Sequence, residues 1–330
     1  MENYMGTMKS NLSSLSYWAS LLMKHKMLLV LAALVIFLSI ASDAFLAPMN
    51  ITNVVRQISI NGILAIAVTF VILTGGIDLS LGSIVALSGV ISTSIVLQGG
   101  PDYIFLGLLG GVLVGAACGL VSGSIISIFK APAFVVTLGM MTILRGLALM
   151  YTNGRPVVGF DSSFLVFGQG FVGFVPMPVA ILILVFIVSL FVLMFTRFGR
   201  HIYAVGGNPE AARVSGVNVT MVKALAYVIS GALAGLGGVI LASRINVGQP
   251  VAGMGSELDA IAAVVIGGTS LSGGTGSVAG TIVGALIIGV INNGMNLMGV
   301  SSDWQQVILG VIIIVAVLID ITANRKKFSK

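Results

Sequence analysis

Long apolar runs, separated by short polar or glycine-rich breaks, make up most of this sequence. A bilayer core of about 30 Å is crossed by about 20 apolar residues in a helix. On that measure the sequence predicts about ten spans, at 27–46, 57–76, 82–98, 103–127, 133–151, 178–196, 221–243, 257–270, 277–298 and 305–321. The eighth is short and ends in glycines, so we expect a broken or re-entrant segment. The predicted fold class is an all-α polytopic membrane protein, with one transmembrane domain over 1–330.

Composition strengthens the membrane assignment. The 330 residues are 57% hydrophobic and 8% charged, with a mean hydropathy of +1.13, whereas a soluble domain carries about 25% charged residues. The 43 glycines agree, because small residues let membrane helices approach closely. The first apolar run follows a long polar leader, and Ala41-Ser42-Asp43-Ala44 is a poor cleavage site. We therefore expect an uncleaved first helix rather than a removed signal peptide.

The basic residues predict an orientation, since cytoplasmic loops are enriched in lysine and arginine. With a cytoplasmic N-terminus, twelve of them face the cytoplasm: Lys9, Lys24, Lys26, Lys130, Arg197, Arg200, Arg213, Lys223, Arg325, Lys326, Lys327 and Lys330. Only Arg56, Arg155 and Arg244 face outward, and Arg145 lies within a span, close enough to its outer end to extend toward the interface. Both termini, including the segment 1–26, and the polar break 197–220 are thus predicted to be cytoplasmic. The loop 152–177 is predicted to lie outside, and the net charge of +6 fits orientation better than nucleic-acid binding.

The break at 197–220 has the signals of a short surface helix. Asn208 can cap it and Pro209 suits its first position. Glu210 lies in the first turn, where the helix dipole favours a carboxylate, and Gly216 can end the helix. Small residues between them would suit insertion into a groove on another protein. The alternative is an ordinary loop with one helical turn.

Polar residues in or near the membrane are unfavourable there and are candidates for function. Those singled out for a transport path are Asp78, Ser80, Ser270, Asn292 and Asn296. Asp78 could instead cap the next helix, and the two asparagines, which share a helix face, could join helices. Glu257 and Asp259 open the eighth span on the outer side. Arg155 and Arg244, beside a loop rich in phenylalanine, are candidates for docking an external partner, although such aromatic residues also mark the membrane interface.

The sequence lacks the residues that several kinds of functional site require. The chain contains no Gly-x4-Gly-Lys-Ser/Thr sequence, so it cannot bind ATP through a P-loop. Neither histidine neighbours a cysteine or an acidic cluster, which argues against a metal site. The single cysteine, Cys118, excludes an intrachain disulfide. Carboxylates in the middle of spans, which proton-coupled transport generally uses, are absent, and this counts against a secondary transporter.

A weak internal repeat is also present. The segment Gly75–Ser83 is similar to Gly267–Ser277, which is two residues longer. Glycine-interrupted segments in matching places of two halves point to the transport path. The sequence therefore predicts two pseudo-repeated halves. The count of crossings makes the two copies parallel, whereas an inverted repeat requires an odd offset, and the sequence leaves the orientation open.

Five motifs together resemble the ribose-type monosaccharide permeases of bacterial ATP-binding-cassette importers. They are Leu73–Ser80, Tyr151–Gly154, Ala204–Asn208, Glu210–Gly216 and Gly267–Gly274. The resemblance implies a homodimer in the bacterial inner membrane, a separate ATPase subunit that uses ATP and Mg, and a periplasmic sugar-binding protein. It also implies that the cytoplasmic break couples to the ATPase through Gly206, Gly207, Asn208, Glu210, Ala211, Ala212, Arg213 and Gly216.

The resulting prediction is a non-catalytic, cofactor-free permease subunit that imports ribose or a similar pentose. A permease for a hexose or for autoinducer-2 is an alternative within the same family. A secondary sugar transporter without an ATPase is an alternative from another class. A membrane-embedded enzyme would need a cluster of catalytic residues, and the sequence offers no obvious set.

Overall fold

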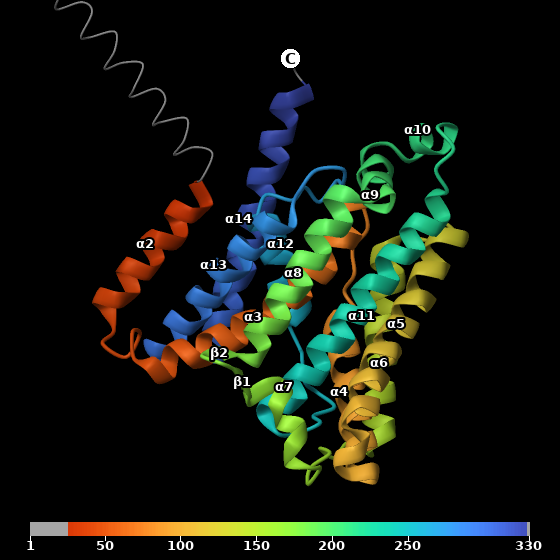
Figure 1. Ribbon diagram of the computed structural model, residues 1–330. Helices are drawn as coiled ribbons and strands as arrows, with labels where there is room; N and C mark the ends of the chain where they lie inside the picture. The colour runs from red at the N-terminus through yellow and green to blue at the C-terminus, as the bar shows by residue number, and fades with distance from the viewer. Residues whose placement is uncertain (1–25, 329–330) are drawn as a thin grey trace, which may run out of the picture.

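The computed structural model describes residues 26–328, which form a bundle of helices (Figure 1). The helices are α2 (Lys26–Ala41), α3 (Pro48–Leu73), α4 (Leu81–Gly99), α5 (Ile104–Ile128), α6 (Ala133–Thr152), α7 (Val166–Gln169), α8 (Met177–Phe195), α9 (Arg197–Gly207), α10 (Pro209–Val214), α11 (Val219–Ile245), α12 (Ser256–Ile266), α13 (Val278–Leu297) and α14 (Ser302–Phe328). Two 3-10 helices, η1 (Gly100–Tyr103) and η2 (Ser162–Leu165), and two short strands, β1 (Phe171–Val172) and β2 (Val175–Pro176), complete the described chain. Nearly all of the predicted cytoplasmic segment 1–26 lies outside the described residues.

Six segments of the described chain are long and apolar enough to cross a membrane. Five of them are the single helices α3, α6, α8, α11 and α13. The sixth, Leu81–Ile128, holds α4 and α5, which are joined by η1 and pack against each other. Two apolar helices are shorter, at Met27–Ala41 and Ser302–Leu318. A multi-pass helical membrane protein is therefore confirmed, while the count of about ten spans stays a prediction.

The segment predicted as a broken eighth span is a short, buried helix. Helix α12 has 11 residues, so it is roughly 16 Å long, about half of a bilayer core. It packs against α3, α13 and α14. The helix stops at Ile266 because Gly268 adopts a left-handed backbone, with φ +87°. An irregular segment, 267–277, then leads to α13.

Helix α3 starts earlier and stops earlier than the predicted span 57–76. It begins at Pro48, because its polar first half finds partners: Asn50 exchanges hydrogen bonds with Asn293, and Arg56 donates one to the Gln169 carbonyl. It ends at Leu73, where Gly75 turns the chain with φ +76°. The next residues, 76–80, are irregular and mostly buried before α4 begins.

Glycines bring α5 and α11 into backbone contact. The α5 glycines that face α11 recur every fourth position, at Gly111, Gly115, Gly119 and Gly123. A Cβ at Gly115 would overlap the carbonyl oxygen of Gly231, and a Cβ at Gly231 would overlap that of Gly115. Small residues at this spacing permit close packing of membrane helices. This pair, with α4 alongside, forms the most tightly packed part of the bundle.

The two longest connections between the apolar helices, 152–177 and 196–218, lie at opposite ends of the bundle (Figure 1). Helices α9 and α10 and the end of α14 lie at one end, and α7, β1 and β2 lie at the other (Figure 1). At the second end, Phe164 is fully buried and packs edge-on against Phe160 and Phe167. Some of the predicted interfacial aromatic residues therefore form a small core, while Phe174 remains 99% exposed.

Candidate functional site

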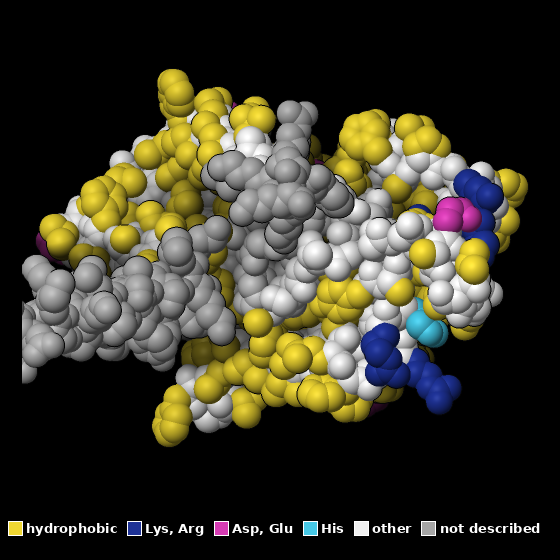
Figure 2. Space-filling model, turned by 90° about the horizontal axis from the view of Figure 1, so that it is seen from above, with side chains coloured by type: hydrophobic (Ala, Val, Ile, Leu, Met, Phe, Trp, Pro, Cys, Tyr) yellow, Lys and Arg dark blue, Asp and Glu magenta, His cyan; other side chains and the backbone are white. Residues whose placement is uncertain are grey.

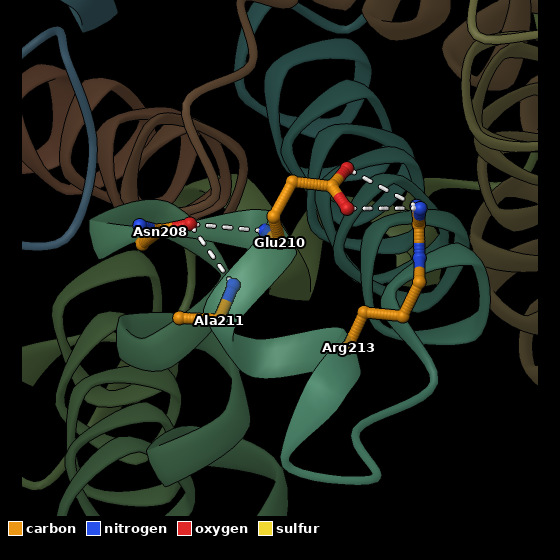
Figure 3. Close-up of polar contacts among 4 residues, drawn as sticks. All are labelled: Asn208, Glu210, Ala211 and Arg213. Atoms are coloured by element: carbon orange, nitrogen blue, oxygen red, sulfur yellow. Dashed lines mark hydrogen bonds and ion pairs between the residues drawn. The ribbon is translucent and has the colours of Figure 1, made fainter.

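The predicted short helix in the break at 197–220 is present as α10, and its N-terminus is capped by Asn208. The Asn208 side-chain oxygen accepts hydrogen bonds from the backbone N–H groups of Glu210 and Ala211, both at 3.0 Å (Figure 3). Pro209 occupies the first turn, and Gly216, with φ +84°, reverses the chain after the helix. The sequence signals for the start and the end of this element act as predicted.

The exposed surface of α10 includes an apolar side chain at the last residue of the helix. Ala212 is buried against the bundle, whereas Ala211 is exposed and Val214 is 90% exposed. Glu210 and Arg213 form an ion pair with 3.2 Å between the carboxylate and the guanidinium. Because both side chains are largely exposed, this pair contributes little to stability, about 0–1 kcal/mol. The result is a small protruding surface with one ion pair and one exposed valine.

Basic side chains gather at this end of the molecule, as Figure 2 shows from above. They come from the end of α5, from α9, from α10 and from the start of α11: Lys130, Arg197, Arg200, Arg213 and Lys223. A shallow cavity of about 230 Å³ lies between α10 and the adjoining ends of α5 and α11. The protruding surface therefore carries a positive rim.

Helix α9 connects α10 to the interior of the bundle. Glycines from three segments of the chain lie in backbone contact at the end of α9, and we call this contact the glycine junction: Gly75, Gly206, Gly207, Gly273 and Gly274. The Gly274 N–H donates a hydrogen bond to the Leu73 carbonyl at 3.0 Å. A Cβ at Gly206 would overlap that same carbonyl oxygen. Tyr203, also on α9, donates a hydrogen bond to the Gly276 carbonyl at 3.0 Å. The junction thus joins α9 to the end of α3 and to the segment before α13.

The two copies of the weak repeat meet at this junction. A Cβ at Gly273 would lie 2.7 Å from the backbone nitrogen of Gly75. Ser270 is buried and closes a turn within its own segment, because its N–H donates to the Thr275 carbonyl at 3.0 Å. Contact between the copies does not establish two pseudo-repeated halves, which stay a prediction.

Asp78 is fully buried in the irregular segment after α3, and it does not cap α4. The cap position is Ser80. One carboxylate oxygen of Asp78 accepts hydrogen bonds from the Ser80 N–H at 3.0 Å and from the Ser80 hydroxyl at 2.6 Å. The other accepts one from Ser230 on α11 at 3.1 Å. Tyr227, one turn earlier on α11, donates to the Ile77 carbonyl at 3.1 Å. The irregular segment is therefore fastened to α11.

Asn292 and Asn296 lie at the end of the bundle away from α10. They line a cavity of about 500 Å³ between α3, α12, α13 and α14, and we call it the polar cavity. Asp259, in the first turn of α12, lies beside Asn292 in this lining. The Asn296 side-chain oxygen accepts one from Gln305 at 2.8 Å. The five path candidates thus fall in three places rather than one.

Sequence reasoning missed three of the six amide and carboxylate side chains that line the polar cavity. Gln57, Gln305 and Gln306 line it with the two asparagines. A usable signal was present, because Gln57 and the Gln305-Gln306 pair lie at the edges of apolar runs, where charge or amide groups are unfavourable in lipid. What the sequence could not give was that α3 and α14 border the same space.

The arginines proposed for docking are at the end opposite α10. Arg155 is exposed and lines a cavity of about 380 Å³ with Tyr151 and Val157. Arg244, at the end of α11, lies within electrostatic range of Arg56 rather than Arg155. Arg145 does extend toward this end, where its guanidinium donates to the carbonyls of Pro250 and Ala252 at 2.9 and 2.8 Å.

The known proteins that this chain matches are transport permeases. The family model described as "Branched-chain amino acid transport system / permease component" matches residues 50–317. The ribose import permease RbsC of Bacillus subtilis (strain 168) is 47% identical over 87% of this chain and 89% of its own length. RbsC of Escherichia coli (strain K12) is 46% identical over 93% and 95%.

A relative with another sugar in its name is more distant. The D-allose transport system permease protein AlsC of Escherichia coli (strain K12) is 39% identical over 90% of this chain and 91% of its own. No solved structure matches the chain. Because the family model spans most of the sequence and the ribose permeases align almost end to end, the chain belongs to the ribose-type sugar permeases of ATP-binding-cassette importers.

Proposed function

We propose that this chain is the membrane-spanning subunit of an importer for ribose or a closely related monosaccharide. A separate ATPase would supply the energy, a periplasmic binding protein would deliver the sugar, and a second copy of the chain would complete the pathway. The inner membrane is the proposed location, with both termini and α10 in the cytoplasm. The substrate is supported by the two ribose import permeases that are 46–47% identical to this chain.

The observation that carries the coupling role is the position of α10. This capped helix protrudes from the bundle, and it continues through α9 into the glycine junction. A push on α10 would therefore reach the ends of α3 and α13 through backbone contacts rather than through flexible side chains. Energetic coupling between sites requires such a physical connection between elements that can adopt two arrangements. We propose that Gly206–Gly216 transmits ATPase movement to the path.

At the opposite end, we propose that the binding protein docks on the surface around Arg155 and Arg244. Both arginines belong to the face that carries α7, β1 and β2. Guanidinium groups on a rim steer an acidic partner and fix its register.

The test measures uptake of labelled ribose in the organism that encodes the chain, after deletion of the gene and return of the wild-type chain. We expect uptake to be lost and restored. Arsenate, which depletes ATP, should abolish the restored uptake, whereas an uncoupler given with ATP maintained should leave it. Uptake that follows the ion gradient instead would favour a secondary transporter. Labelled allose and leucine serve as comparison solutes, because relatives or the family description carry those names.

A further inference from the structure

The polar cavity is not explained by coupling to an ATPase, because it lies at the end of the bundle away from α10. Six of its lining side chains carry an amide or a carboxylate: Gln57, Asp259, Asn292, Asn296, Gln305 and Gln306. They come from four helices, α3 near the start of the chain and the consecutive helices α12, α13 and α14 near its end. At about 500 Å³, the cavity is within the range of small-molecule sites, roughly 300–1,000 Å³.

Amide and carboxylate groups that face lipid raise the free energy of the folded protein in the membrane considerably. Asn292 lies on α13, which is one of the six candidate spans, about five residues or roughly 8 Å from the end of that helix. Asn296 accepts a hydrogen bond from Gln305, but each side-chain amide has two N–H donors and two acceptor positions on its oxygen. The side chains of Gln57 and Gln306, both of which are exposed, form no hydrogen bond within residues 26–328. The cavity therefore holds more hydrogen-bonding capacity than its own residues use.

The charge of the cavity lining favours a neutral sugar over an amino acid. No lysine or arginine is among the described residues that line the cavity, so the carboxylate of an amino acid would lack a cationic partner. The first turn of α12 also carries Glu257 and Asp259, which act against an anion there. A hydroxyl group both donates and accepts, and it matches amides and a carboxylate without any net charge. Met254, Leu258 and Leu309 supply an apolar surface for the C–H groups of a sugar ring.

We propose that the polar cavity is a binding site for a neutral monosaccharide within the permease itself, with Asp259, Asn292, Gln57 and Gln306 as hydrogen-bonding residues. This proposal rests on the proposed function and adds to it a site in this chain, so that solute selection is not left wholly to a binding protein. Phosphorylated sugars and amino acids are excluded by the same lining.

The direct test uses the purified full-length chain in lipid nanodiscs, with a small thiol reagent and D-ribose as the probe. Gln306→Cys places a thiol in the cavity lining. Asp303→Cys places one on the same helix, one turn earlier, which is exposed as Gln306 is but lies outside the cavity lining. The native Cys118 is buried, so its background labelling is small. We expect ribose to slow labelling of Gln306→Cys several-fold, with no effect of leucine and no change at Asp303→Cys.

Three outcomes would overturn the site. They are an unchanged labelling rate at Gln306→Cys with ribose at concentrations that saturate uptake, protection by leucine instead, or equal protection at Asp303→Cys. These readouts need neither ATP nor partner subunits, so they remain valid whatever the uptake experiment gives.

Uptake in the complemented deletion strain separates this inference from the proposed function. Asn292→Ala and Asp259→Asn are each expected to lower kcat/KM for ribose about tenfold, the factor for losing one or two hydrogen bonds. Membrane level and ATPase co-purification should stay at the wild-type value. If the wild-type chain imports ribose and both variants do so equally well, the cavity is not the site, and the proposed function stands. If the wild-type chain does not import ribose, the proposed function itself fails.

Discussion

Gly206 has no room for a side chain. A Cβ there would overlap the Leu73 carbonyl oxygen and the Gly274 nitrogen, and both of these are backbone atoms that cannot rotate away. Its neighbour Gly207 has open space around the same position. Two adjacent glycines of one helix thus differ in whether they tolerate a side chain. The sequence alone does not reveal this difference.

The first prediction compares these two positions. Gly206→Ala should destabilise the chain by about 1–3 kcal/mol, as overpacking generally does, and should also reduce ribose uptake. Gly207→Ala should be neutral or slightly stabilising, because alanine is the better helix former by about 1 kcal/mol. Thermal unfolding in detergent and uptake by whole cells measure the two effects. Equal behaviour of the two variants would contradict the backbone contact at the glycine junction.

At the scale of elements, α10 is a helix of 6 residues, too short to be stable by its own backbone bonds. It depends on its cap, on Ala212 packed against the bundle, and on the turn at Gly216. The Glu210–Arg213 pair is too exposed to replace the cap. Of these contributions, the cap is the one that a single substitution removes cleanly.

We therefore expect Asn208→Ala to loosen α10, at a cost of about 1 kcal/mol. Amide hydrogen exchange at 210–214 should accelerate, and the ATPase should co-purify less well. Asn208→Asp is the matched control, because it keeps the accepting oxygen and adds a charge that the helix N-terminus favours. If Asn208→Ala exchanges at the wild-type rate, the cap is not what holds this helix.

The contact between α5 and α11 gives a second prediction for elements. Gly115→Leu would force the two backbones apart, since Gly231 and Gly235 lie directly against Gly115. We expect loss of folded protein in the membrane, measured by size-exclusion chromatography of a fluorescent fusion. Gly146→Leu on α6 is the control, because the corresponding position there has open space. A folded, monodisperse Gly115→Leu variant would contradict the close approach.

The elements also show how far the sequence alone could go. Apolar length predicted most helices, and Asn208, Pro209 and Gly216 predicted α10, because these signals are local. The sequence placed the end of the second span at 76, although the chain leaves helix after Leu73. Hydropathy places such an exit only within a few residues, because the turn at Gly75, with φ +76°, sets the end of this helix rather than a change in polarity. The polar cavity was out of reach for another reason, since its lining depends on which helices become neighbours.

At the scale of the whole molecule, the basic residues and the protruding α10 mark one end, and the 152–177 connection marks the other (Figures 1 and 2). The excess of lysine and arginine predicts that the α10 end is cytoplasmic. Opposite ends of one bundle must lie on opposite sides of the membrane when the spans between them cross it.

Cysteine substitution checks this orientation in intact cells. Arg155→Cys should react with an impermeant thiol reagent added outside, and Arg213→Cys should react only after the cells are opened. The unsubstituted chain, with its buried Cys118, serves as the control. Equal reactivity of the two variants in intact cells would contradict the assigned sidedness.

The fastening of the irregular segment to α11 has a consequence for biosynthesis. Ile77 and Asp78 receive bonds from Tyr227 and Ser230, which follow 150 and 152 residues later in the chain. A ribosome that adds about 5–20 residues per second needs roughly 8–30 s to make that stretch. Until α11 leaves the ribosome and enters the membrane, the Asp78 carboxylate lacks its Ser230 partner, and the first helices cannot settle into their final arrangement. Nascent chains that end before 219 should therefore be prime substrates for membrane quality-control proteases.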